Sequence, residues 1–238
     1  MKNLEQYVCK NCGFNIIGYH PDNCPFCGAP KENFITAEDC SEQYKIIRKK
    51  VTEKVYLLKS DPPLGLEHNA YKIKTLGHVL WIDCPSTFDK SVEKMDINLF
   101  THHHFIAAAN LYKKNFDSRI WIPIRDSNNY IANKYEFDRE FDSNFTLYDL
   151  NSYHINGHTN GFTSYIFHNC LFICDYVFIG KNSSKFNPYG PYQPTLKGAK
   201  ELLNLLSSKE IEFVCGYNYT LNFKDWIKKL KILIKKRN

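Results

Sequence analysis

The chain has 238 residues, of which 43% are hydrophobic and 15% aromatic, as in a globular protein with a substantial core. Its net charge of +6 is modest and gathers in residues 224–236, so composition does not favour a nucleic-acid partner. No run reaches the roughly 18 apolar residues of a membrane-spanning helix, and the first 20 residues hold no apolar signal core. Together with nine cysteines, these features favour a reducing, cytoplasmic compartment.

Four of the cysteines form two Cys-x-x-Cys pairs near the N-terminus: Cys9 and Cys12, then Cys24 and Cys27. Gly13 and Gly28 directly follow the second cysteine of each pair, where a glycine lets backbone N–H groups approach the sulfurs. Two such turns predict a tetrahedral four-sulfur site for one zinc or one iron ion. A unit as short as residues 1–35 cannot build a core of its own and needs the metal to fold.

This segment resembles a rubredoxin, closest to the short-loop type that forms the tail of rubrerythrins. The matching features are Tyr7 before the first cysteine, Phe14 after Gly13, the sequence Cys-Pro-Phe-Cys-Gly at 24–28 and the closing Lys-x-x-Phe at 31–34. The resemblance implies an electron-transfer iron held by the four thiolates. A structural zinc ion is the alternative.

Residues 36–50 are polar and charged, which predicts a linker, and a second domain is expected over residues 51–238. Its apolar runs alternate with helical patterns and turn signals. Strands are expected at 55–58, 69–73, 77–83, 97–100, 119–123, 163–167, 171–174 and 212–216, and helices at 86–94, 107–112, 194–206 and 224–236. This order favours a mixed α/β or α+β sandwich over a simple doubly wound sheet.

Three consecutive histidines follow the expected strand at 97–100. Side chains at the carboxyl end of a parallel strand face the crevice where α/β proteins bind ligands. His102 and His104 are two residues apart, so in extended backbone they project from the same side and supply half of a metal site. We expect His103 and His154 to lie at the surface or behind the ligands, and His68 to be an ordinary residue. The alternative is an exposed histidine run without function.

The order of short motifs is similar to that of the metallo-β-lactamase fold, an αββα sandwich, over residues 51–238. These motifs are a strand ending in Asp83, Thr-His-x-His at 101–104, Gly-His-Thr-x-Gly at 157–161 and Leu-Phe-x-x-Asp at 171–175. The resemblance implies that His102, His104 and His158 hold the first metal, that Asp175 is the aspartate that usually bridges two metals, and that Asp83 orients the histidines from behind. Asp175 and His158 are the candidate catalytic residues.

The ligands of a second metal are missing from this pattern. Ile106 and Ala107 stand where the family has Asp-His, and Tyr217 stands where its last histidine is expected. The sequence therefore predicts one mononuclear site for iron or zinc, as in the persulfide dioxygenases of this fold. A single Zn²⁺ could activate water near pH 7, whereas a single Fe²⁺ could bind oxygen or a sulfur species.

Three functions remain open at this point. The first is a redox enzyme in which the four-cysteine centre passes electrons to the mononuclear site, with a reductase or ferredoxin-like protein as redox partner and a small molecule as substrate. The second is a hydrolase of small esters or thioesters with a structural zinc. The third is a non-catalytic electron carrier. For the first, we expect the four-cysteine centre to lie over the histidine crevice, within one chain or across a homodimer.

Overall fold

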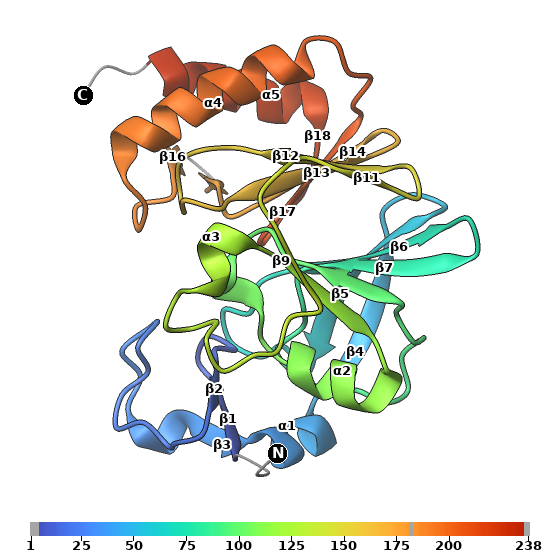
Figure 1. Cartoon of the computed structure of the whole chain (residues 1–238). Helices are drawn as coiled ribbons and strands as arrows, with labels where there is room; N and C mark the ends of the chain where they lie inside the picture. Colours follow the sequence, from blue (N-terminus) through green and yellow to red (C-terminus); the bar gives the residue numbers. More distant parts are fainter. Residues whose placement is uncertain (1–4, 181–182, 236–238) are drawn as a thin grey trace.

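The computed structural model describes residues 5–180 and 183–235 (Figure 1). Two large sheets lie face to face in these ranges, with helices on their outer faces and a small N-terminal unit at one end. None of the helices in these ranges combines the length and apolarity needed to cross a bilayer. The ends of the expected units, at 1–4 and 236–238, lie outside the described residues.

The N-terminal unit is a three-stranded antiparallel sheet. Its central strand, β1 (Gln6–Cys9), pairs with β2 (Asn15–Ile17) on one side and β3 (Phe34–Thr36) on the other. A 3-10 turn, η1 (Lys31–Asn33), leads into β3. Because Cys9 ends β1 and lies opposite Phe34, the first Cys-x-x-Cys turn begins where the small sheet ends.

The segment 36–50 is more ordered than the linker we expected from its polar composition. It holds α1 (Ala37–Gln43) and β4 (Lys45–Lys50), and β4 forms the edge of the larger sheet. The side chain of Thr36 caps α1 by accepting a hydrogen bond from the Asp39 N–H at 3.0 Å. Charged side chains suit an edge strand, because they remain in water and discourage pairing with another chain. Polarity here therefore indicates an edge strand.

The larger sheet has seven strands in the order β10-β9-β8-β7-β6-β5-β4. After β4 come β5 (Val55–Asp61), β6 (Ala70–Thr75), β7 (His78–Ile82), β8 (Ile97–Leu99), β9 (Arg119–Pro123) and β10 (Arg139–Phe141). β7, β8 and β9 are parallel, so their carboxyl ends meet at one edge. Thr101 and the histidines follow β8 at that edge, as the sequence predicted.

The second sheet has six strands in the order β11-β12-β13-β14-β17-β18. They are β11 (Thr146–Leu147), β12 (Leu150–His154), β13 (Thr163–Phe167), β14 (Cys170–Cys174), β17 (Phe213–Gly216) and β18 (Thr220–Asn222). A separate ribbon pairs β15 (Val177–Ile179) with β16 (Ser184–Phe186). Asp175 directly follows β14 and Tyr217 directly follows the parallel strand β17, so both residues lie at one edge of this sheet.

Alternating side chains divide each sheet between two cores. Ile73 and Leu80 of the first sheet pack with Tyr165 and Phe172 of the second. On the outer faces, α2 (Ala109–Phe116) covers the first sheet, and α4 (Tyr192–Leu206) and α5 (Phe223–Lys235) cover the second (Figure 1). The layers are therefore αββα, as predicted.

The helix expected at 86–94 does not form. The side chain of Asp89 instead accepts hydrogen bonds from the backbone N–H groups of Ile46 and Ser91 at 2.8 and 2.9 Å. Aspartate and serine side chains often compete in this way with helical hydrogen bonds. The loop that results is hydrogen-bonded to β4, the edge strand of the larger sheet. A four-residue helix, α3 (Ile124–Ser127), follows β9.

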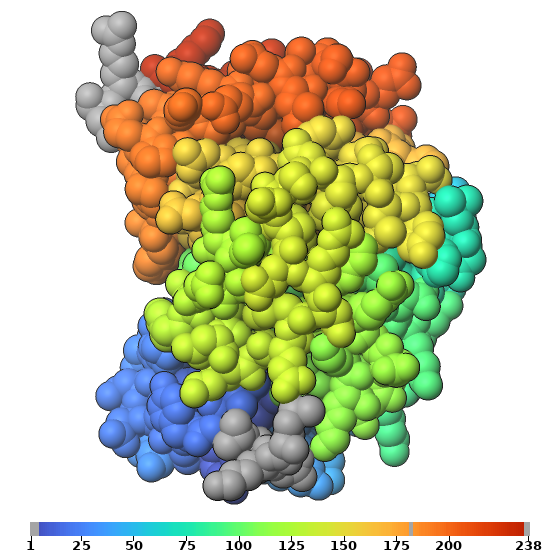
Figure 2. Space-filling model, viewed as in Figure 1, coloured from blue at the N-terminus to red at the C-terminus, as the bar shows by residue number. Residues whose placement is uncertain are grey.

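The N-terminal unit packs closely against the larger domain (Figure 2). Asn15 donates a hydrogen bond to the carbonyl oxygen of Ser86 at 3.0 Å, and Asn110 donates to Gln6 at 2.7 Å. The Leu66 N–H donates to the carbonyl oxygen of Asn11 at 2.9 Å, within the first Cys-x-x-Cys turn. These contacts involve two strands of the small sheet and its first Cys-x-x-Cys turn, so they fix the orientation of the unit.

Candidate metal centres

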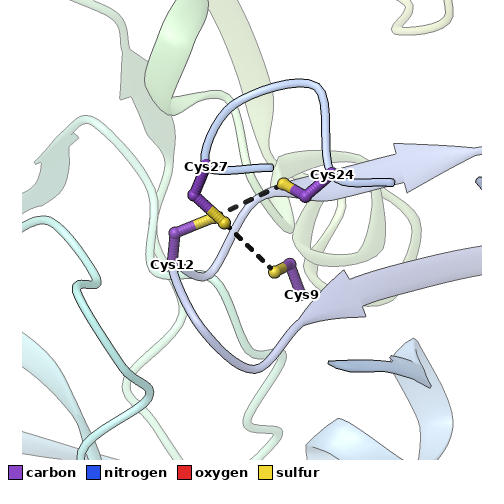
Figure 3. Close-up of side chains that lie close together, drawn as sticks. All are labelled: Cys9, Cys12, Cys24 and Cys27. Atoms are coloured by element: carbon purple, nitrogen blue, oxygen red, sulfur yellow. Dashed lines mark hydrogen bonds between the residues drawn. The ribbon is translucent and has the colours of Figure 1, made fainter. Parts of the chain in front are cut away.

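The four N-terminal cysteines point toward one another (Figure 3). The sulfurs of Cys9 and Cys27 are 3.8 Å apart and those of Cys12 and Cys24 are 3.7 Å apart, with all four within 4.8 Å. Bonds of about 2.3 Å to one central ion place tetrahedral sulfurs about 3.8 Å apart. The cluster therefore has the size of a four-thiolate site for one ion.

Backbone conformation builds both halves of this cluster. Gly13 and Gly28 have φ values of +76° and +73°, which glycine adopts at little cost, and their N–H groups close turns onto the carbonyls of the preceding pair at 2.7 and 2.8 Å. Asn11 also donates a hydrogen bond to the sulfur of Cys27 at 3.3 Å. The hydrogen-bonded sulfur of Cys24, together with burial, raises the pKa of the Cys12 thiol. A cation is therefore needed to hold all four sulfurs as thiolates.

The second centre gathers His102, His104, His158 and Asp175. His102 and His104 flank the start of η2 (His103–Phe105) after β8, and His158 lies in the loop after β12. His104 Nδ1 is 3.0 Å from His102 Nε2 and 3.1 Å from His158 Nε2. Ligands of one small cation lie about 3.0 to 3.4 Å apart, so the three ring nitrogens have the spacing of a metal site.

The carboxylate of Asp175 completes this set. Its two oxygens lie 3.5 Å from His102 Nε2 and 3.4 Å from His158 Nε2. Among the described residues Oδ1 is buried without a hydrogen-bond donor, which is costly for a carboxylate. A cation among the three nitrogens would satisfy it, so the residues present fit a single metal ion.

The surroundings set the charge of these ligands. Burial lowers the pKa of His102 and lowers that of His104 to about 3, so both imidazoles are neutral at pH 7. Burial alone would raise the pKa of Asp175, but the interaction with His158 holds that pKa below its usual value. Neutral imidazoles and an ionised carboxylate are the protonation states that bind a metal.

Asp83 acts on His102 through Thr101. Its carboxylate accepts hydrogen bonds from the backbone N–H and the hydroxyl of Thr101, both at 2.9 Å. Because the hydroxyl donates to Asp83, its oxygen accepts from His102 Nδ1 at 2.9 Å. This pattern leaves the lone pair of His102 Nε2 facing the cluster. The expected orienting role of Asp83 is thus exerted through one intervening side chain.

The positions of the missing second-metal ligands are filled by other groups. Ile106 is buried in the core beneath η2, and Ala107 lies beside it with a φ of +48°. Tyr217 lines the same cavity as His158 and Asp175. Across residues 5–180 and 183–235, the four-cysteine cluster and this one are the groups with metal-site geometry.

Asn187 and Asp126 lie near this centre, and nothing in the sequence marked either of them. Asn187 donates a hydrogen bond to Asp175 Oδ2 at 2.8 Å, yet it directly follows the short strand β16 in a stretch of sequence that carries no motif. His103 is buried behind the ligands, one of the two locations expected for it, and is hydrogen-bonded to Asp126, whose other oxygen accepts from Thr159 at 3.0 Å. These contacts hold the loops of His102 and His158 together.

Two other histidines, His68 and His154, lie close to these loops. His68 is buried, stacks on Phe105 with ring centroids 4.1 Å apart and lies 2.7 Å from the carbonyl oxygen of Cys84. It therefore has a defined place beside the centre, which the sequence analysis did not assign to it. His154 is exposed beside Arg125, one of the two locations expected for it.

One cavity of about 660 Å³ connects the two centres. Cys12 and Phe26 of the N-terminal unit line it together with His104, His158 and Asp175. Phe26, which lies between Cys24 and Cys27, has its ring centroid 6.3 Å from that of His104. The four-cysteine unit therefore lies over the histidine crevice within a single chain.

Comparison with known proteins supports both parts of this description. Residues 7–35 match the family model of the rubrerythrin rubredoxin-like domain. The sequence matches no curated protein.

Solved structures match the larger part of the chain. The DIM-1 metallo-β-lactamase has a TM-score of 0.62 and 16% identity over 80% of this chain and 95% of its own. FIM-1 from Pseudomonas aeruginosa, in a mono-zinc form, has a TM-score of 0.62 and 11% identity over 91% and 98%. The archaeal superfamily protein ST1585 from Sulfolobus tokodaii has a TM-score of 0.54 and 16% identity over 71% and 81%. The chain thus combines a rubredoxin-like unit with a metallo-β-lactamase fold, and both resemblances are confirmed.

Proposed function

We propose that the chain is a redox metalloprotein with two single-ion centres. Cys9, Cys12, Cys24 and Cys27 would hold an iron ion that supplies electrons, and His102, His104, His158 and Asp175 would hold a second metal ion at which a small-molecule substrate binds. The contact between Phe26 and His104 carries this proposal, because it leaves one aromatic ring between a four-cysteine turn and a ligand of the second centre.

The protein's own residues have separate tasks in this scheme. The thiolates hold the first ion, and Asn11 stabilises the charge on Cys27 through its N–H···S hydrogen bond. The three imidazoles and Asp175 hold the second ion, which when bound supplies a Lewis-acid or redox-active point with positions free for substrate. Asn187 fixes one carboxylate oxygen of Asp175, so the other faces the cluster.

Docking of the small unit supports electron transfer over a merely structural role. An inert zinc turn needs no fixed position over a second centre, whereas an electron carrier gains from one. The carrier here shares a cavity with the candidate substrate site. An external one-electron donor protein would reduce the four-cysteine centre, and each electron would leave it singly.

A metal-dependent hydrolase is the second candidate, with zinc at both centres. The likeness to metallo-β-lactamases, including one in a mono-zinc form, favours it. In that case Asp175 and His158 would hold the ion that activates water. The two candidates differ in whether the four-cysteine centre changes oxidation state.

Rapid kinetics on the iron-loaded full-length protein tests the redox proposal. After less than one electron per chain is added from dithionite, the visible absorption of the four-cysteine centre should bleach and then partly recover as the electron redistributes. His158→Ala removes a ligand of the second centre and should abolish the recovery, whereas His168→Ala, at an exposed site, should retain it. Equal traces for both variants would contradict electron transfer between the centres.

A further inference from the structure

We propose that the cavity between the two centres binds a flat, apolar molecule that carries an anionic group. This inference names the substrate class for the proposed function and rests on it only for calling the ligand a substrate. The volume of about 660 Å³ lies within the range of small-molecule sites in proteins.

Exposed apolar side chains gather at this cavity. Phe26, Leu66, Tyr130 and Tyr189 are 42%, 75%, 67% and 76% exposed, and all four line it. Single exposed apolar residues are ordinary, but a group of them around one hollow marks a binding surface. Because they surround a hollow that leads to His104 and Asp175, a small molecule fits this surface better than a broad protein interface.

Aromatic rings give the cavity walls their shape. Phe14 and Phe26 of the N-terminal unit stack at 5.9 Å with an interplanar angle of 5°. Phe178 and Tyr217 of the larger domain form a second pair with centroids 4.8 Å apart. Rings of this kind favour stacking or edge contacts with a planar ligand. The N-terminal unit thus forms part of the substrate wall as well as holding a metal.

Lys59 gives the cavity one cationic side chain, and its charge acts through space on the buried carboxyl of Glu67. Lys59 is the cationic side chain among the described lining residues, and it makes no hydrogen bond or ion pair within the described chain. The nearby carboxylate of Glu67 is already satisfied by Ser60 and Ser86, with N–H contacts at 3.0 and 2.8 Å. A carboxylate, sulfonate or phosphate on the ligand would pair with the Lys59 ammonium group.

Calorimetric titration of the zinc-loaded full-length protein with two probes tests this assignment. 2-Naphthalenesulfonate carries the anion and coordinates metals poorly, whereas 2-naphthalenemethanol has the same rings without charge. We expect the sulfonate to bind at least tenfold more tightly. Lys59→Met should abolish this preference and leave the alcohol unchanged, whereas Lys59→Arg should keep it.

Two further variants make the result specific. Lys49→Met removes an exposed lysine of the neighbouring strand outside the cavity and should keep the preference. Phe26→Ala should weaken both probes about tenfold. Equal binding of the two probes, no binding of either, or a preference that survives Lys59→Met would overturn the assignment. Zinc takes no part in electron transfer, so this outcome is independent of whether the redox proposal holds.

Discussion

The ring of Phe26 meets the ring of His104 at a centroid distance of 6.3 Å and an interplanar angle of 62°. Phe26 belongs to the turn that presents Cys24 and Cys27, and His104 presents Nδ1 to the other two histidines. This single contact joins segments 78 positions apart in the sequence. The contact depends on how the N-terminal unit packs against the larger domain. A substitution of Gly65, which lies at this interface, tests that packing.

Gly65 sets the approach of the larger domain to the first Cys-x-x-Cys turn. It has a φ of +55°, and a Cβ atom there would overlap the carbonyl oxygen of Asn11. We expect Gly65→Ala to lower the free energy of unfolding by roughly 2 kcal/mol more than backbone strain alone and to weaken metal retention by the cysteines. Urea denaturation and metal analysis of the zinc-loaded protein measure both effects.

Gly77→Ala is the matched control. Gly77 has a φ of +80° with open space around it, so the variant carries similar strain without the overlap. If the two variants lose the same stability and keep the same metal, the docking contact at Gly65 has no energetic role.

Thr101 connects Asp83 to His102, so its hydroxyl should affect the metal affinity of the second centre. We expect Thr101→Val to weaken zinc binding there by about 10- to 100-fold, because the His102 ring loses the hydrogen bond that fixes its tautomer. Competition with a chromophoric chelator measures this affinity. Thr75→Val removes another buried hydroxyl, which bonds the Tyr148 carbonyl at 2.8 Å, and should leave it unchanged. Similar zinc affinities in Thr101→Val and Thr75→Val would contradict a role of the Thr101 hydroxyl in orienting His102.

His68 makes stability depend on pH in a defined direction. Burial lowers its pKa from 6.5 to about 4, so between these values the unfolded chain binds a proton that the folded chain does not. The free energy of unfolding should therefore fall as pH falls through this window, by about 3 kcal/mol at most for this residue. In His68→Gln the fall between pH 7 and pH 4.5 should be smaller by about 2 kcal/mol.

Urea denaturation at the two pH values measures this difference. His168→Gln changes an exposed histidine and should show the wild-type fall. An unchanged fall in His68→Gln would mean that folding does not lower the pKa of His68, so that this histidine is protonated at pH 4.5 in the folded protein.

Metal stoichiometry separates the two centres. Because Ile106 and Ala107 replace the second-metal ligands, the full-length protein should retain two zinc ions after gel filtration in excess zinc. Cys24→Ser and His158→Ala should each retain one, and the double variant none. A third retained ion would show that the larger domain holds a metal pair.

The most accurate sequence predictions concerned features that are determined by residues close together in the sequence. The paired cysteines specify their own turns, and the buried strands Arg119–Pro123 and Thr163–Phe167 coincide with the expected ranges. The resemblance to the metallo-β-lactamase fold predicted that His158 and Asp175 lie beside His102 and His104. Hydrophobic periodicity alone could not have predicted this grouping.

The failures share a physical cause. The helix expected at 86–94 does not form because the Asp89 carboxylate accepts hydrogen bonds from backbone N–H groups, and β4 is an edge strand whose polar composition resembles that of a linker. Asn187, just after β16, and Asp126, in α3, act through contacts with residues that are distant in the sequence. Local sequence carries no signal for such contacts, because the partners lie far away along the chain.

Metal analysis and visible absorption of protein purified without oxygen test the redox proposal most directly. We predict one iron per chain at Cys9, Cys12, Cys24 and Cys27, red in the ferric state and bleached by one electron per centre. The Cys24→Ser variant should lose both the colour and that iron, whereas Cys170→Ser, at a buried cysteine outside the cluster, should keep both. A colourless protein with zinc at the four cysteines, unchanged by dithionite, would contradict electron transfer and leave the hydrolase.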